Sequence, residues 1–189
     1  GWSGIFAGLT ALAGVAAAFF YLDRHSIGFQ EVILTPMEGV DTGVAAVGVT
    51  PGIFLLLDAG LVLLLALTLA LFFSWRKSIR NKEKFWSPVL FRLVMVLAIP
   101  LGAGGIFAGI LIWQGMAAQV VAVMLIFYGL ALVSAGKYTN REITWLGMAE
   151  IVAGLLAGLW PAFGPWFWGA GFGVFHVIYG ITLYLKYER

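Results

Sequence analysis

The chain has no cysteine among its 189 residues and only two histidines, His25 and His176. The absence of cysteine excludes disulfides, thiolate metal sites and cysteine nucleophiles. A bis-histidine haem needs two imidazoles inside the bilayer, and only His176 lies in an apolar segment. HExxH, GxSxG and Walker motifs are also absent, and no lysine lies within an apolar segment to form a Schiff base. We therefore predict no enzymatic activity, no cofactor and no metal site.

Charged residues are scarce as well. They make up 11% of the chain, against about 25% in soluble domains, while 62% of the residues are hydrophobic. This composition predicts a polytopic membrane protein in contact with a lipid bilayer. The formal net charge of +2 does not indicate nucleic acid as a partner, because the cations lie almost entirely in short loops, where membrane topology explains them.

Long apolar runs predict the fold. A helix needs about 20 apolar residues to cross a hydrocarbon core about 30 Å thick, and in lipid only helices and closed barrels satisfy their own backbone. Six runs are long enough, and none alternates as a barrel strand would. They are Trp2–Leu22, Pro51–Trp75, Pro88–Trp113, Met116–Ser134, Ile143–Trp160 and Pro165–Leu185. The sequence therefore predicts an all-α membrane bundle of six transmembrane helices, forming a single domain over residues 1–189.

Positive charge indicates the orientation of these spans. The loop 76–84, RKSIRNKEK, holds a cluster of cations, and placing it in the cytoplasm puts every lysine and arginine except Arg24 at or near that side. We therefore expect both termini in the cytoplasm and the long loop 23–50 on the outer side. The Val, Ile and Gly residues of this loop leave two alternatives, a cap packed on the helices or a solvated connection.

The number of spans raises the question of a duplicated chain. Three spans followed by three would place the two halves in opposite orientations, as in transporters with a 3+3 inverted repeat. Asp58 in the second span and Glu150 in the fifth hold corresponding positions, and GIFAG occurs at both 4–8 and 105–109. The two copies of GIFAG lie in non-equivalent spans, so chance recurrence among 25 glycines is the better explanation of that motif.

Glu150 and His176 form the strongest candidate site. The tight turn PAFGP joins the last two spans, and each of the two residues lies thirteen positions from Phe163 at its centre, so they share one depth near the midplane. Small residues at helical spacing let helices approach closely in lipid. One such stripe follows Glu150, and another follows His176. The members of the first stripe are Gly147, Gly154 and Gly158, and those of the second are Gly169, Gly173 and Gly180. We expect the two stripes to line one seam, with His176 facing the fifth span or a neighbouring helix and Glu150 as its favoured partner.

Two roles for this buried polar pair stay open. An interhelical hydrogen bond that fixes packing contributes about 0.6–2 kcal/mol in membranes. A proton-responsive element is the functional alternative, because ionisable residues inside a membrane are costly and usually serve a function.

Other polar residues lie nearer the membrane faces. Asp58 lies near 10 Å below the outer surface at about 1.5 Å per residue, and Gln119 enters the fourth span from the same side. The two could line an outer vestibule, although a carboxyl bonded to a tyrosine or a backbone carbonyl explains Asp58 somewhat better. Arg92 lies close to the cytoplasmic end of the third span, where we expect it to anchor the inner interface by snorkelling.

Several stretches carry a resemblance to known proteins. These are GWSGIFAG, YGLALVSAGKYT, WLGMAEI, GFGVFHVIYG and LYLKYER, which cover the first span and most of the last three. The chain resembles an uncharacterised family of small bacterial six-span conserved membrane proteins. The resemblance implies a six-span topology and the bacterial inner membrane, and it implies no chemistry.

The function that the sequence favours is that of a non-enzymatic inner-membrane protein, an accessory or assembly component of a membrane complex. Its partners would be other membrane subunits, or a second copy bound through glycine stripes, since the first and third spans also carry GxxxG. The alternative is a channel or transporter for protons or a small solute, with Glu150, His176 and Asp58 along the route. A membrane enzyme is the least favoured class, because no nucleophile is paired with a base.

Overall fold

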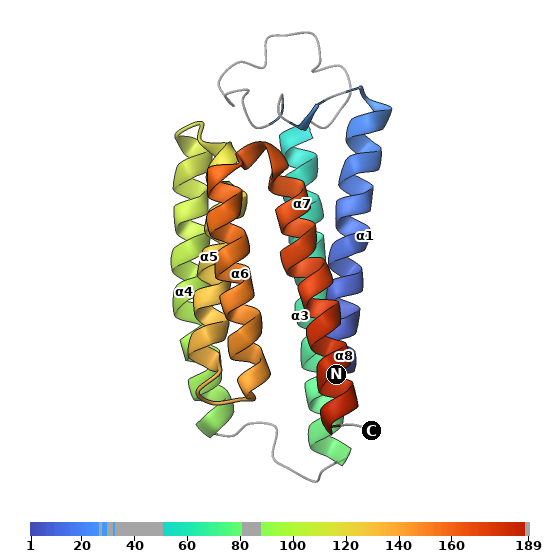
Figure 1. Cartoon of the computed structure of the whole chain (residues 1–189), viewed down its shortest axis with the longest axis vertical. Coiled ribbons are helices and arrows are strands. Elements are labelled where there is room, and N and C mark those ends of the chain that lie inside the picture. The colour runs from blue at the N-terminus through green and yellow to red at the C-terminus, as the bar shows by residue number, and fades with distance from the viewer. Residues whose placement is uncertain (27, 30–31, 33–50, 81–87, 188–189) are drawn as a thin grey trace.

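The computed structural model describes residues 1–26, 28–29, 32, 51–80 and 88–187, and long helices dominate these ranges (Figure 1). The first five are α1 (Trp2–Arg24), α3 (Pro51–Arg80), α4 (Pro88–Trp113), α5 (Val120–Ala135) and α6 (Arg141–Leu159). The last crossing consists of α7 (Gly164–Trp168), the π-helix η4 (Gly169–Phe175) and α8 (His176–Tyr187). The 3-10 turns η2 (Ala117–Gln119) and η3 (Pro161–Phe163) precede α5 and α7.

All six predicted spans coincide with helices. In the described part of the chain, five segments are long and apolar enough to cross a membrane: α1, α4, η2 with α5, α6, and the run Pro161–Tyr187. The remaining predicted span, Pro51–Trp75, lies within α3, whose described residues include the apolar stretch Leu57–Ala66. The chain is therefore a polytopic membrane protein.

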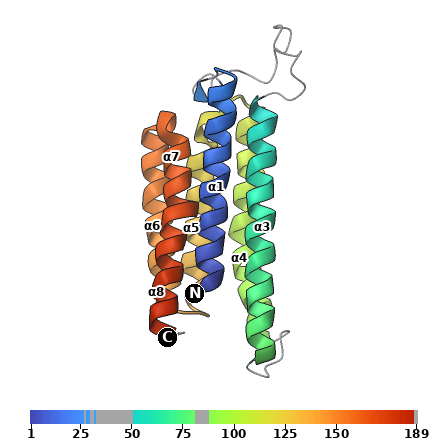
Figure 2. The same cartoon turned by 90° about the vertical axis from the view of Figure 1, so that its right-hand side faces the viewer.

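The helices form two rows of three that run along a common axis. One row holds α4, α5 and α6, with α5 packed between its two neighbours (Figures 1 and 2). The other row holds α3, α1 and α8, with α1 in the middle. The rows join where α6 and α5 contact α7, η4 and α8. This junction between the rows holds the most buried ionisable residues of the described chain.

Local sequence explains where the helices start and stop. Gly115 has φ +74°, a conformation that glycine adopts without strain, and it turns the chain between α4 and η2. Asn140 caps α6 in an extended conformation, as is common at helix starts. Trp160 precedes Pro161, and a residue before proline disfavours the α conformation, so α6 ends at Leu159.

Both ends of the chain lie at the same end of the bundle (Figure 1). Gly1 packs directly on Tyr184 of α8. The cytoplasmic location of this end stays a prediction. Most of the predicted outer loop, residues 27, 30–31 and 33–50, lies outside the described residues, as do Lys82, Lys84 and Arg189 from the orientation argument. The predicted 3+3 inverted repeat also stays a prediction. The two residues that suggested it differ in burial, because Asp58 is half-buried and Glu150 is fully enclosed.

Candidate functional site

Glu150 lies halfway along α6 and is fully enclosed, with 0% of its surface exposed. Its carboxylate lies against Gly171 of η4, so closely that a Cβ at position 171 would overlap Oε2. Leu125 of α5, also 0% exposed, borders the same position. Because glycine lacks a side chain, Gly171 leaves room for the carboxylate between α6 and the last crossing.

His176 begins α8 and contacts three groups from three different elements. Its Nε2 lies 2.7 Å from the hydroxyl oxygen of Tyr128 on α5. Its Nδ1 lies 3.1 Å from the carbonyl oxygen of Gly171 and 3.4 Å from Oε1 of Glu150. A carbonyl oxygen only accepts hydrogen bonds, so Nδ1 carries a proton and donates it. Nε2 then accepts from the Tyr128 hydroxyl when the ring is neutral and donates to it when the ring is protonated.

The charge balance of Glu150 depends on His176. Neither carboxylate oxygen of Glu150 has a hydrogen-bond partner in the described part of the chain. Among the ion pairs of the described residues, the one that involves Glu150 joins it to His176. His176 supplies the positive charge in this pair when its ring is protonated. A buried charge without a partner is strongly destabilising, so the two groups are expected to be charged together or neutral together.

The π-helix η4 brings these groups into contact. A π-helix bonds residue i to residue i+5, and such segments often occur at functional sites. In η4, this spacing places His176 next to the carbonyl of Gly171, five residues earlier. Gly169, Gly171 and Gly173 are all buried in this segment, where bulkier residues would separate it from its neighbours. The glycine-rich sequence GAGFG thus lets the Glu150 side chain of α6 approach at Gly171, while α1 approaches at Gly169 and Gly173.

The predicted contact between the two glycine stripes is wrong. Gly147 and Gly154 of α6 pack on α5, where Gly129 makes the reciprocal contact with Gly147. Gly173 and Gly180 of the last crossing pack on α1 instead. The reason is that α5 and α1 carry their own small residues and approach these stripes more closely. Glu150 and His176 still meet, because the opening at Gly171 lets the carboxylate reach the last crossing.

The other predicted site residues lie away from this cluster. Asp58 of α3 is half-buried and faces α1, with Oδ2 3.2 Å from where a Cβ on Gly14 would lie. Gln119 ends η2 and faces α6, near Gly158. The outer vestibule of Asp58 and Gln119 stays a prediction, since they lie against different helices. Arg92 is exposed on α4, and its role as an anchor at the inner interface stays a prediction.

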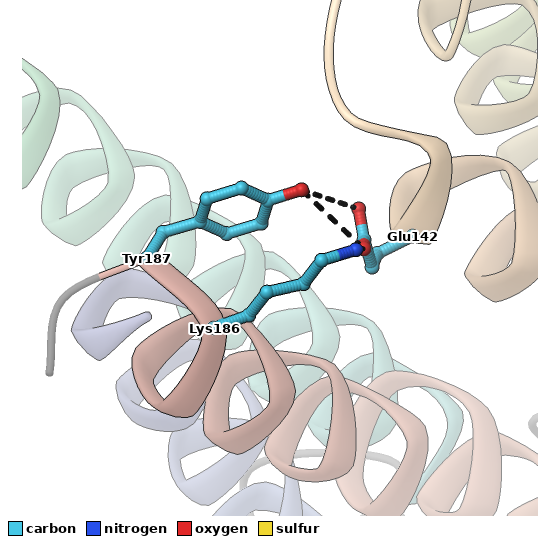
Figure 3. Close-up of polar contacts among 3 residues, drawn as sticks. All are labelled: Glu142, Lys186 and Tyr187. Atoms are coloured by element: carbon cyan, nitrogen blue, oxygen red, sulfur yellow. Dashed lines mark hydrogen bonds and ion pairs between the residues drawn. The ribbon is translucent and has the colours of Figure 1, made fainter.

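A second polar cluster joins the start of α6 to the end of α8. Lys186 donates a close hydrogen bond to Oε1 of Glu142, and the Tyr187 hydroxyl lies 3.4 Å from Oε2 (Figure 3). The Lys186 side chain is 57% exposed, so solvent screens this ion pair. The cluster closes the lower end of the contact between α6 and the last crossing.

Sequence reasoning missed Tyr128 and Gly171. Counting residues from the α5–α6 turn would have found Tyr128, because it lies ten positions before Tyr138 and Glu150 lies twelve after it. A tyrosine hydroxyl in a buried helix needs a hydrogen-bond partner, and His176 is at the right depth. No comparable signal distinguishes Gly171 from the other 24 glycines of the chain, since the π turn decides its role.

Among the described residues, no group of three or more His, Asp or Glu side chains is arranged to hold a metal ion. Comparisons with protein-family models, with curated proteins and with solved structures find no match to this chain.

Proposed function

We propose that this polytopic membrane protein is a non-enzymatic, proton-responsive protein of the bacterial inner membrane, of the channel or transporter class. In this proposal, Glu150, His176 and Tyr128 exchange a proton during the passage of protons or a small solute. The observation that carries it is the enclosed Glu150 carboxylate, which has no hydrogen bond in the described chain and lies 3.4 Å from Nδ1 of His176. Both termini would lie in the cytoplasm, as the loop charges indicate.

The energies of the charged and neutral forms support a switch. At 3.4 Å, the attraction between the carboxylate and an imidazolium is about 5 kcal/mol at an effective dielectric constant of about 20. Placing two ionised side chains inside a membrane costs about 5 to 7 kcal/mol on the insertion scale. The attraction and the cost of burying the charges nearly cancel. A modest change in surroundings therefore changes whether Glu150 and His176 are both charged or both neutral.

The order of the groups also supports proton exchange. The hydroxyl of Tyr128, the two ring nitrogens of His176 and the carboxylate of Glu150 follow one another from α5 through α8 to α6. An imidazole can release a proton from one nitrogen while it takes up another on the opposite nitrogen. The cluster therefore has the parts of a short proton relay across the junction between the two helix rows.

Infrared difference spectroscopy tests whether the site titrates. Between about pH 5 and pH 8, where histidine changes charge, we expect a carboxylic-acid band that changes in the wild type and is lost in Glu150→Gln. Glu142→Gln is the matched control, because it removes the carboxyl at the lower end of the same helix and should retain the band. A band that persists in Glu150→Gln would assign the titration to another carboxyl group.

Proteoliposomes with a trapped pH indicator test whether protons move. The wild type should carry protons faster than empty vesicles, and Glu150→Gln and His176→Gln should both return to the background rate. Tyr128→Phe should slow the flux without abolishing folding, since it removes one hydrogen bond to His176. Absence of flux in the wild type, together with no titration of Glu150, would leave the pair a purely structural contact.

The second candidate function is that of an accessory or assembly component of a membrane complex, and α4 favours it. Gly102, Gly105 and Gly109 on this helix have nothing within 4 Å of where a Cβ would lie. Such a stripe lets another transmembrane helix approach closely, from a different subunit or a second copy. Gly105→Leu should then reduce co-purification or oligomer formation, whereas Gly60→Leu, at an equally open glycine on α3, should not. Equal behaviour of the two variants would speak against a partner on α4.

A further inference from the structure

A narrow groove of about 450 Å³ runs along α6 on the side that faces the last crossing. The wall from α6 consists of Trp145, Met148, Ala149, Val152, Ala153 and Leu156. The opposite wall consists of Phe167 of α7 with Ala170 and Phe175 of η4. The lining is almost entirely apolar. Three of its lining residues are the small alanines Ala149, Ala153 and Ala170, and three are the aromatic residues Trp145, Phe167 and Phe175.

The dimensions of the groove limit what it can hold. From Trp145 to Leu156 the groove extends about 16 Å, since each helical residue adds about 1.5 Å. A volume of about 450 Å³ spread over that length gives a cross-section of about 28 Å². An α-helix with its side chains is about 10–12 Å wide, so its cross-section is about 80–110 Å². A single hydrocarbon chain therefore fits inside the groove, whereas a transmembrane helix is too wide to enter it.

The groove opens towards the membrane. Its rim residues Trp145, Met148 and Val152 are 59%, 48% and 56% exposed, and they belong to a helix that is long and apolar enough to span the bilayer. Lipid acyl chains are the hydrocarbon that surrounds such a surface.

The lower end of the groove carries positive charge. Trp145 lies one helical turn from Arg141, which is exposed and makes no ion pair with any described residue. Lys186 reaches this end from α8 (Figure 3), and Lys137 lies in the turn before α6. Glu142 is the one carboxylate of the described residues in this cluster, so the three cations leave an excess of positive charge. Trp145 lies near the start of α6, and tryptophan is enriched where membrane helices reach the lipid headgroups.

We propose that this groove binds one acyl chain of an anionic phospholipid, with the phosphate held at the lower end by Arg141 and Lys186. The charge of the lower end complements the phosphate, and charged donors make strong hydrogen bonds to phosphate oxygens. The bound chain covers Ala149 and Phe175, which are the sequence neighbours of Glu150 and His176. A lipid in the groove therefore covers the membrane side of the buried pair Glu150 and His176. This inference does not rest on the proposed function.

Native mass spectrometry of the detergent-purified chain tests the proposal. The protein is given equal amounts of phosphatidylglycerol and phosphatidylcholine with identical chains, and the retained lipids are counted. We expect one tightly held lipid per chain, with phosphatidylglycerol preferred. Val152→Trp fills the mouth of the groove and should lower retention of both lipids at least tenfold, because displacing two methylene groups already has an effect of that size. Arg141→Gln should reduce the preference for phosphatidylglycerol about fivefold, while the chain still binds.

Matched variants separate this site from general lipid adhesion. Leu155→Trp introduces the same ring at a 57% exposed position of α6 outside the groove, and Arg92→Gln removes an exposed cation from α4. Both should behave as the wild type, and thermal unfolding shows whether each variant is folded. Equal losses in Val152→Trp and Leu155→Trp would overturn the groove. Equal losses in Arg141→Gln and Arg92→Gln, or no headgroup preference in the wild type, would overturn the phosphate site. If Val152→Trp does not fold, the two arginine variants decide the outcome.

Discussion

Gly171 has no side chain, and the Glu150 carboxylate occupies the space that a Cβ at this position would fill. A buried carboxyl group needs a partner of opposite charge or a hydrogen bond. Here the partner is His176, oriented on its other side by the Tyr128 hydroxyl. Four residues thus define the site: the acid Glu150, the base His176, Tyr128 with its hydroxyl, and Gly171.

The substitution Gly171→Ala tests this packing. The added Cβ would overlap Oε2 of Glu150 and lie 2.6 Å from Cδ2 of Leu125, and both of these side chains are fully enclosed. Overpacking of this kind costs about 1–3 kcal/mol, so the unfolding temperature should fall. The measurement is thermal unfolding in detergent.

Gly60→Ala is the control for this change, since nothing lies within 4 Å of its Cβ position. The control should unfold at or above the wild-type temperature, because alanine favours a helix over glycine by up to about 1 kcal/mol. If Gly171→Ala were as stable as Gly60→Ala, the carboxylate would not occupy the space described.

At the scale of helices, two close-packed seams hold the bundle together. The seam between α5 and α6 is formed by Gly129 and Gly147, each packed on the backbone carbonyl of the other. The seam between α1 and the last crossing is formed by Gly4 with Gly180 and by Gly8 with Gly173. Lipid provides no hydrophobic force between helices, so close van der Waals packing of small residues is what associates them.

Gly147→Ala should weaken the first seam. Its Cβ would lie 2.6 Å from the carbonyl oxygen of Gly129 and 2.8 Å from the backbone nitrogen of Val133, and a backbone cannot move aside as a side chain can. We expect a loss of about 1–3 kcal/mol in the free energy of unfolding. Gly158→Ala, on the same helix, should have little effect, because its nearest neighbour is Ala122 Cβ at 3.6 Å. A larger loss at Gly158 than at Gly147 would contradict the assigned seam.

At the scale of the whole molecule, the two rows of three helices place both chain ends at one end of the bundle (Figure 1). An even number of long helical segments that alternate in direction requires this arrangement. The turn after α4 and the turn before α6 lie at opposite ends, since α5 separates them. The prediction from the distribution of lysine and arginine is that the end with the termini is cytoplasmic.

Because the chain has no cysteine, single introduced cysteines report the orientation without background. A membrane-impermeant maleimide applied to intact cells should label Gln114→Cys, in the exposed turn after α4. It should label Tyr138→Cys, in the exposed turn before α6, only after the cells are permeabilised. The reverse pattern would invert the topology, and labelling of both in intact cells would mean that α5 does not cross the membrane.

The sequence by itself determined the features that depend on local composition. Helices occupy all six apolar runs, because each run must satisfy its own backbone in lipid. The chain turns at Pro161, as the PAFGP motif predicts, and at Gly115, where glycine adopts a positive φ without strain. The equal distance of Glu150 and His176 from one turn also followed from residue counting, since two antiparallel helices rise at the same rate.

Only the tertiary structure decided which faces meet. Glycine stripes on α6 and on the last crossing have similar spacing, so the pattern does not show whether each packs on the other or on a third helix. The structure pairs them with α5 and α1, because those helices offer matching small residues. The π turn at Gly171 and the bond from Tyr128 to His176 likewise depend on the relative placement of three helices, which no stretch of sequence contains.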